Sequence, residues 1–143
     1  MEKEENEKMK ALARYGKEFG GYRMIDVPKP TCGPEDIIIE IKAAAICGAD
    51  MKHYKVDNGS DEFNSIRGHE FAGEIVEVGE KVTDWKVGQR VVSDNSAHVC
   101  GVCPACEQGD FLCCESKVNL GLDNNTWGGG FSKSVSYTHL TLP

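Results

Sequence analysis

The sequence lacks a long hydrophobic run, and its amino terminus carries no apolar segment. No stretch approaches the roughly 18 consecutive apolar residues that a membrane span requires. Residues 1–10, MEKEENEKMK, are charged almost throughout, whereas a secretory signal peptide needs an apolar core at this place. The pattern therefore predicts a cytoplasmic protein that does not use a membrane as a partner.

Basic residues are too few for a nucleic-acid-binding surface. The 143 residues include 16 lysines and arginines against 23 aspartates and glutamates, which gives a formal net charge of -7. A protein that follows a phosphate backbone needs an excess of cations, so the composition argues against nucleic acid as a partner. Aromatic residues make up only 8% of the chain, but 40% hydrophobic and 27% charged residues are typical of one soluble domain with a core.

No G-x-G-x-x-G motif follows a predicted strand and opens a helix, so the fingerprint of a dinucleotide-binding domain is missing. Segments typical of strands are separated instead by Gly, Pro and Asn. They comprise a hairpin around the glycines at 20 and 21 and strands within residues 35–48, 71–79 and 88–95. Only residues 47–56 have helical character. This pattern predicts a mainly β fold, a barrel or curled sheet with little helix.

We expect one domain, over residues 10–134, flanked by two tails. Residues 1–9 mix charges without apolar periodicity, which predicts a disordered tail. Residues 135–143, VSYTHLTLP, do not continue the strand pattern and resemble a translated sequencing-library adapter. We therefore treat this segment as a non-native tail and exclude it from fold reasoning.

Five of the seven cysteines lie within residues 99–115, VCGVCPACEQGDFLCCE. Cys100, Cys103 and Cys106 are separated by two residues each, a spacing that lets neighbouring thiolates converge on one ion. Tetrahedral Zn²⁺ takes four such ligands, and Cys113 or Cys114 would supply the fourth. An iron–sulfur cluster uses similar spacing, but its bacterial motif ends in C-P after three residues. The pattern therefore favours zinc in a closed, structural site.

A second candidate site combines Cys47 with the segment RGHEF at 67–71. His69 and Glu70 directly precede a predicted strand, and Cys47 follows another. Cysteine, histidine and a carboxylate, with water in the remaining position, have the composition of a catalytic zinc site. A lone histidine before a strand is more often a hydrogen-bonded structural residue, so the hypothesis depends on Cys47 as its partner.

These motifs resemble those of the zinc-containing medium-chain alcohol dehydrogenases. The segment GHEFAG at 68–73, with the following Gly79 and Val82, is similar to the family signature, and ICGAD at 46–50 is similar to its first zinc-ligand motif. The resemblance extends from about residue 10 to about residue 133 and is closest to the sorbitol (iditol) and threonine dehydrogenase branch. It implies the amino-terminal GroES-like β-barrel that holds two zincs, without the Rossmann domain that binds NAD(P).

The resemblance also implies roles for single residues. Cys47 and His69 correspond to ligands of the catalytic zinc, Glu70 to a direct ligand or a carboxylate that exchanges with one, and Asp50 to the hydrogen-bond partner of the imidazole. In most relatives the position of Ala49 carries a hydroxyl that relays the alcohol proton. Alanine cannot do so, so we expect a water or His53 to replace it.

For the cysteine loop, the resemblance selects Cys114 as the fourth structural ligand, beside Cys100, Cys103 and Cys106. The family leaves seven residues after the third ligand, and Cys113 would leave six. We expect Cys113 to be directed toward packing instead. A redox switch formed by Cys113 and Cys114 is disfavoured, because adjacent cysteines need strained geometry to pair.

The resemblance implies an enzyme, an NAD(P)-dependent polyol or secondary-alcohol dehydrogenase that is homo-oligomeric and in which zinc polarises the alcohol oxygen for hydride transfer. Because the family draws another zinc ligand and the nucleotide domain from downstream, we expect the 143-residue chain alone to be inactive. Its catalytic zinc should be weak and its four-thiolate zinc retained. The alternative hypothesis is a non-enzymatic β-barrel whose zinc loop serves structure or partner binding. Two zincs per complete gene product favour the enzyme, and one favours the binding module.

Overall fold

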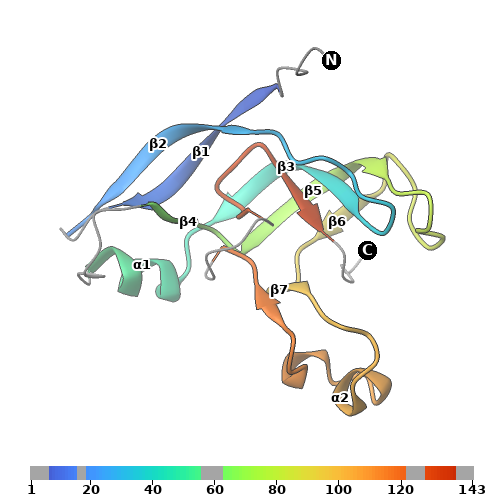
Figure 1. Cartoon of the computed structure of the whole chain (residues 1–143). Helices are drawn as coiled ribbons and strands as arrows, with labels where there is room; N and C mark the ends of the chain where they lie inside the picture. The colour runs from blue at the N-terminus through green and yellow to red at the C-terminus, as the bar shows by residue number, and fades with distance from the viewer. Residues whose placement is uncertain (1–6, 16–18, 56–62, 122–127, 138–143) are drawn as a thin grey trace, which may run out of the picture.

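The computed structural model describes residues 7–15, 19–55, 63–121 and 128–137, and most of them lie in or between strands (Figure 1). The elements in chain order are β1 (Lys8–Tyr15), β2 (Tyr22–Pro28), β3 (Ile37–Ala45), α1 (Gly48–Lys55), β4 (Phe63–Ile66), β5 (Glu70–Val78), β6 (Arg90–Val92), β7 (Ser96–His98), α2 (Pro104–Glu107), the 3-10 turn η1 (Phe111–Cys113), β8 (Val118–Asn119) and β9 (Ser134–Tyr137).

The strands form two antiparallel sheets and a small ribbon. The sheets have the orders β2-β1-β4 and β6-β5-β3-β9, and the ribbon is β7-β8. A bridge between Ala11 and Ser132 joins the first sheet to the segment before β9, and the Leu12 N–H donates to the Phe131 carbonyl at 2.8 Å. The prediction of a mainly β fold with little helix is confirmed.

Most of the long predicted elements are present. β1 and β2 form the expected hairpin, β3 and β5 pair along their lengths, and α1 falls within the segment predicted to be helical. Among the described residues, no helix combines the length and apolar character needed to cross a bilayer. The sequence interpretation missed β4, β7 and β8, which are only two to four residues long and too short to show a periodic pattern.

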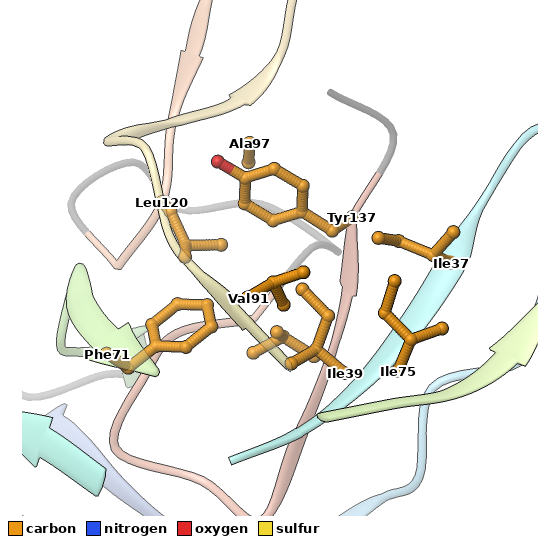
Figure 2. Packing of buried hydrophobic residues seen from close by; sticks show 9 residues of the cluster. Ile37, Ile39, Phe71, Ile75, Val91, Ala97, Leu120 and Tyr137 are labelled. Carbon is orange, nitrogen blue, oxygen red and sulfur yellow. The ribbon is translucent and has the colours of Figure 1, made fainter. Parts of the chain in front are cut away.

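The core lies on one face of the four-stranded sheet (Figure 2). Along β5, Phe71, Gly73 and Ile75 are buried while alternate residues are more exposed, as the two-residue period of a strand requires. The cluster also includes Ala97, which precedes the cysteine-containing segment, and Leu120, which follows it. Its buried members are Ile37, Ile39, Phe71, Ile75, Val91, Ala97, Leu120, Val135 and Tyr137.

Described strands cross both expected boundaries, at residues 10 and 134. At the carboxyl end, Val135 and Tyr137 are 1% and 0% exposed and pair with Ile39 and Ile37 along the edge of β3. The Tyr137 hydroxyl donates to the Asp94 carbonyl at 2.7 Å. At the amino end, β1 already begins at Lys8, inside the expected tail. Met9 is buried between two exposed lysines in β1, and all four residues of β9 are buried. Residues 1–6 and 138–143 of the two expected tails lie outside the described part of the chain.

Candidate metal centres

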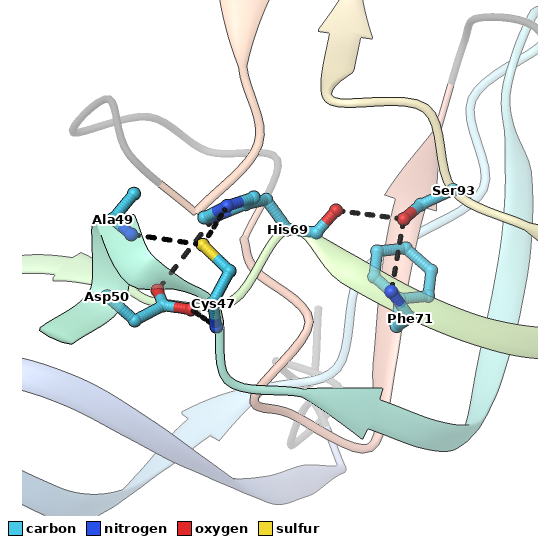
Figure 3. A network of polar contacts seen from close by, with 6 residues as sticks. All are labelled: Cys47, Ala49, Asp50, His69, Phe71 and Ser93. Atoms are coloured by element: carbon cyan, nitrogen blue, oxygen red, sulfur yellow. Dashed lines mark hydrogen bonds and ion pairs between the residues drawn. The ribbon is translucent and has the colours of Figure 1, made fainter.

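The ends of two neighbouring strands bring Cys47 and His69 together. Ala45, the last residue of β3, lies opposite Glu70, the first residue of β5. Cys47 follows the first strand and His69 precedes the second, so the two side chains extend from the same end of the sheet. The Sγ of Cys47 lies 3.0 Å from Nε2 of His69 (Figure 3). A soft sulfur and an imidazole nitrogen at this distance are a donor pair that suits zinc.

Asp50 completes this group from the first turn of α1. Its Oδ2 accepts the Cys47 N–H at 3.0 Å, and its Oδ1 lies 3.8 Å from Nδ1 of His69. Asp50 is 4% exposed and His69 is 7% exposed. Within the described residues, Oδ1 of Asp50 and Nδ1 of His69 are both buried without a hydrogen-bond partner, so a closer approach of these two atoms would give each of them one. The donor atoms of Cys47, Asp50 and His69 lie within 4.8 Å of one another.

Backbone groups with positive partial charge lie next to the Cys47 sulfur. The Ala49 N–H donates to the Cys47 sulfur at 3.3 Å, and Cys47 directly precedes the amino terminus of α1. Amide hydrogens and the positive end of a helix dipole stabilise a negative sulfur. The residues present therefore fit a metal ion that is bound by sulfur and nitrogen.

Two of the predicted site residues lie outside this group. Glu70 begins β5 with its side chain exposed, and it does not belong to the three-residue donor cluster. His53 lies on the exposed part of α1. Desolvation and the nearby charges of Arg67 and Lys52 lower the pKa of His53, so its imidazole is neutral at pH 7.

The second centre lies in the segment between β7 and β8, residues 99–117. This segment, the cysteine lobe, projects away from the sheets (Figure 1). The sulfurs of Cys100, Cys103, Cys106 and Cys114 all lie within 4.8 Å of one another. The Cys114 sulfur is 3.6 Å from that of Cys100, whereas the Cys113 side chain is exposed. The lobe thus gathers Cys114 with the other three and leaves Cys113 outside. Cys113 is directed to solvent rather than to packing.

Backbone amides face the clustered sulfurs. The Cys100 N–H donates to the Cys114 sulfur at 3.4 Å, which lowers the pKa of Cys114. The Cys106 N–H lowers the pKa of Cys103 to about 6, while burial raises the pKa of Cys106 to about 12. Metal binding releases the protons of the remaining thiols. A divalent cation would therefore bind all four sulfurs of this cluster as thiolates.

One residue of this region escaped the sequence interpretation. The Ser93 hydroxyl lies between the carbonyl of His69 and the N–H of Phe71, at 2.9 Å and 3.2 Å (Figure 3). A single serine after a strand has no spacing that distinguishes it, so no signal in the sequence could have found it.

The chain is similar to known alcohol dehydrogenases. The model of the family described as "Alcohol dehydrogenase GroES-like domain" matches residues 33–142. A zinc-type alcohol dehydrogenase-like protein of Escherichia coli K12, YdjL, is 87% identical over 125 residues, which are 87% of this chain and 35% of that protein. A sorbitol dehydrogenase of Halalkalibacterium halodurans is 37% identical over 127 residues, 89% of this chain and 36% of the relative.

A solved structure has the same fold. The crystal structure of CAD from Helicobacter pylori, complexed with NADP(H), has a TM-score of 0.75 and 27% identity, and the match covers 92% of this chain and 39% of that one. The chain thus spans little more than a third of the length of the proteins it matches. The family match and the two relatives agree with the motifs around His69 and in the cysteine lobe. The chain therefore belongs to the alcohol dehydrogenase GroES-like domain family, within the zinc-containing medium-chain alcohol dehydrogenases.

Proposed function

We propose that this chain forms the zinc-binding catalytic domain of an NAD(P)-dependent dehydrogenase that oxidises a polyol or another secondary alcohol. The observation that carries the proposal is the 3.0 Å approach of the Cys47 sulfur to Nε2 of His69, with buried Asp50 at the other ring nitrogen. The sorbitol dehydrogenase among the relatives supports a polyol substrate, and the NADP(H) bound to the solved neighbour supports a nicotinamide cofactor.

Cys47 and His69 would hold the catalytic zinc. When bound, zinc acts as a Lewis acid that polarises the alcohol oxygen for hydride transfer to the nicotinamide. The role of Glu70 as a ligand or exchanging carboxylate stays a prediction, and its exposed side chain at the start of β5 would have to turn toward Cys47. The further ligand that the family requires would come from another part of the parent protein.

The residues around the donor pair would orient it for a metal ion. The Asp50 carboxylate lies beside Nδ1 of His69, so Nε2 is the ring nitrogen that would face a metal shared with Cys47. The Ala49 N–H donates to the Cys47 sulfur. His53, neutral at pH 7 because its pKa is lowered, would accept the alcohol proton, directly or through a water, in place of the hydroxyl that Ala49 lacks.

The cysteine lobe would hold the structural zinc. Cys100, Cys103, Cys106 and Cys114 supply four sulfurs and leave no position for substrate. Zinc there would stabilise a lobe that has few apolar residues of its own. We further propose that the parent is a cytoplasmic homo-oligomer that acts on small molecules.

Metal counting and a chimera test the proposal. The 143-residue chain should bind one zinc tightly and a second one weakly, and Cys47→Ser should abolish only the second. A chimera in which residues 10–134 replace the matching part of the E. coli relative should reduce NAD or NADP with sorbitol or a secondary alcohol, and the same chimera with Cys47→Ser should not.

Three results would contradict it. A single zinc per chimera without alcohol-dependent NAD(P) reduction would favour the non-enzymatic barrel whose zinc loop serves structure or partner binding. Oxidation of a polyol by the 143-residue chain alone would contradict its expected inactivity. Full activity of the Cys47→Ser chimera would remove this residue from the site.

A further inference from the structure

Ser93 makes three hydrogen bonds to the peptide segment that carries His69. Its hydroxyl donates to the His69 carbonyl at 2.9 Å and accepts the Phe71 N–H at 3.2 Å. Its own backbone N–H donates to the Phe71 carbonyl at 2.9 Å. Figure 3 shows the hydroxyl placed between the two groups, on the opposite side of His69 from Cys47 and Asp50.

The side chain of Ser93 replaces a strand partner that the backbone cannot supply. β6 ends at Val92, which pairs with Ala72, and the chain then leaves toward β7 and the cysteine lobe. The His69 carbonyl, two residues before Phe71, would lie beyond the end of this ladder. A buried carbonyl or N–H without a partner is costly. The hydroxyl satisfies one of each and keeps β5 ordered up to its first residues.

The position of His69 depends on this support more than that of Cys47 does. Cys47 is held separately, because its N–H binds Asp50 in the first turn of α1. The imidazole of His69 is attached to the same Cα as the carbonyl that Ser93 holds, so a rotation of this peptide moves both ring nitrogens. It would change the 3.0 Å distance from Nε2 to the Cys47 sulfur and the 3.8 Å distance from Nδ1 to Asp50.

We propose that Ser93 is a positioning residue of the Cys47–His69 centre, which orients the imidazole through the His69 carbonyl. The inference rests on the proposed function in so far as a metal binds this centre. Ser93 touches neither of the donor atoms, so its effect passes entirely through the backbone of residues 69–71.

The test uses the 143-residue chain with one equivalent of zinc, so that the cysteine lobe is filled. Ser93→Ala removes the hydroxyl, while Ser93→Thr and Ser93→Val form a pair of equal shape that differs only in the hydroxyl. Ser132→Ala is the matched control, because this hydroxyl also donates to backbone carbonyls, those of Gly129 and Ser134, and does not contact the centre. Amide exchange at Phe71, the NOE between the His69 ring and the Cys47 Hβ protons, and a Co²⁺ titration are measured for each variant.

Ser93→Ala and Ser93→Val should accelerate Phe71 amide exchange at least ~10-fold, weaken the NOE and reduce Co²⁺ affinity at the second site about 10–100-fold, as is usual for residues that orient a metal ligand. Ser93→Thr and Ser132→Ala should behave like the unchanged chain. If Ser93→Ala does not fold, the Thr and Val pair carries the comparison.

An unchanged NOE in the hydroxyl-free variants would overturn the proposal, and so would an equal loss in Ser93→Thr or Ser132→Ala. Unchanged Co²⁺ affinity despite a weakened NOE would also overturn it. If the unchanged chain binds no second Co²⁺ at all, the proposed catalytic metal fails, while the NOE and exchange data still decide whether Ser93 positions His69.

Discussion

Gly121 lies directly against Gly68, the residue before His69. A Cβ added to Gly121 would be 2.1 Å from the Gly68 carbonyl oxygen, and the backbone of Gly121 has a φ of +65°. The Gly68 carbonyl also accepts the Gly130 N–H at 2.7 Å. The chain that leaves the cysteine lobe therefore packs against the residue before His69, while Ser93, which leads into the lobe, binds the His69 carbonyl.

Gly121→Ala should destabilise the chain strongly. The new methyl group meets backbone atoms that cannot rotate away, so overpacking adds to the strain of a positive φ. Together they should lower the free energy of unfolding by at least about 3 kcal/mol. Gly88→Ala is the control, because Gly88 has a φ of +89° with open space around its Cβ position. It should cost only the backbone strain, about 1 kcal/mol. Urea unfolding of both zinc-loaded variants measures the difference, and equal losses would show that the close contact is absent.

The two adjacent cysteines should respond differently to substitution. Cys114→Ser removes a sulfur from the cluster and should abolish the intense thiolate-to-Co²⁺ absorption of the lobe. Cys113→Ser changes only an exposed thiol and should leave the absorption unchanged. A loss of the Co²⁺ signal in Cys113→Ser that Cys114→Ser does not share would reverse the assignment.

The sequence was sufficient for the parts of the sites that depend on local spacing. Three cysteines at intervals of two residues indicate one metal wherever the loop lies, and the seven-residue interval in related proteins selected Cys114. Cys47 and His69 were paired in the sequence as residues next to strand ends, but their approach depends on the register of β3 against β5, which the sequence does not give. Ser93 and Gly121 could not be predicted, since their roles arise from contacts between segments distant in sequence.

The fold shows the same division. The hairpin of β1 and β2 and the strands β3 and β5 are each seven to nine residues long, and the sequence predicted them. Residues 135–137 of β9 were left out of the expected domain because the sequence of residues 135–143 resembles a translated adapter. Burial, however, depends only on side chains and register, and Val135 and Tyr137 have the alternating apolar character that the exposed edge of β3 requires. The origin of this segment does not affect that physical argument.

Truncation should therefore reveal where the domain ends. A chain that stops at Ser134 loses two buried apolar side chains and the hydrogen bond from Tyr137 to Asp94, so it should lose at least about 3 kcal/mol of unfolding free energy. A chain that stops at Tyr137 keeps all of these contacts and serves as the control. Urea unfolding of the two chains makes the comparison, and equal stability would support the boundary expected at residue 134.

Asp50→Asn should weaken metal binding at Cys47 and His69 without disturbing the cysteine lobe. The amide keeps an oxygen for the Cys47 N–H, but it removes the negative charge beside Nδ1 of His69, so the ring loses the carboxylate that would orient it. We expect Co²⁺ affinity at this centre to fall about 10–100-fold, while the thiolate absorption of the lobe stays the same.

Glu70→Gln tests the carboxylate that stays a predicted ligand although its side chain is exposed and lies outside the donor cluster. If Glu70 does not bind the metal in the 143-residue chain, this variant should bind Co²⁺ as the unchanged chain does, and a loss would support Glu70 as a ligand. The comparison shows which of the two carboxylates beside His69, that of Asp50 or that of Glu70, supports metal binding. If Glu70→Gln loses affinity and Asp50→Asn does not, Glu70 supplies the carboxylate and the burial of Asp50 next to His69 serves the fold alone. The arrangement of Cys47, Asp50 and His69 favours the opposite result, because only Asp50 offers a buried oxygen that has no other partner.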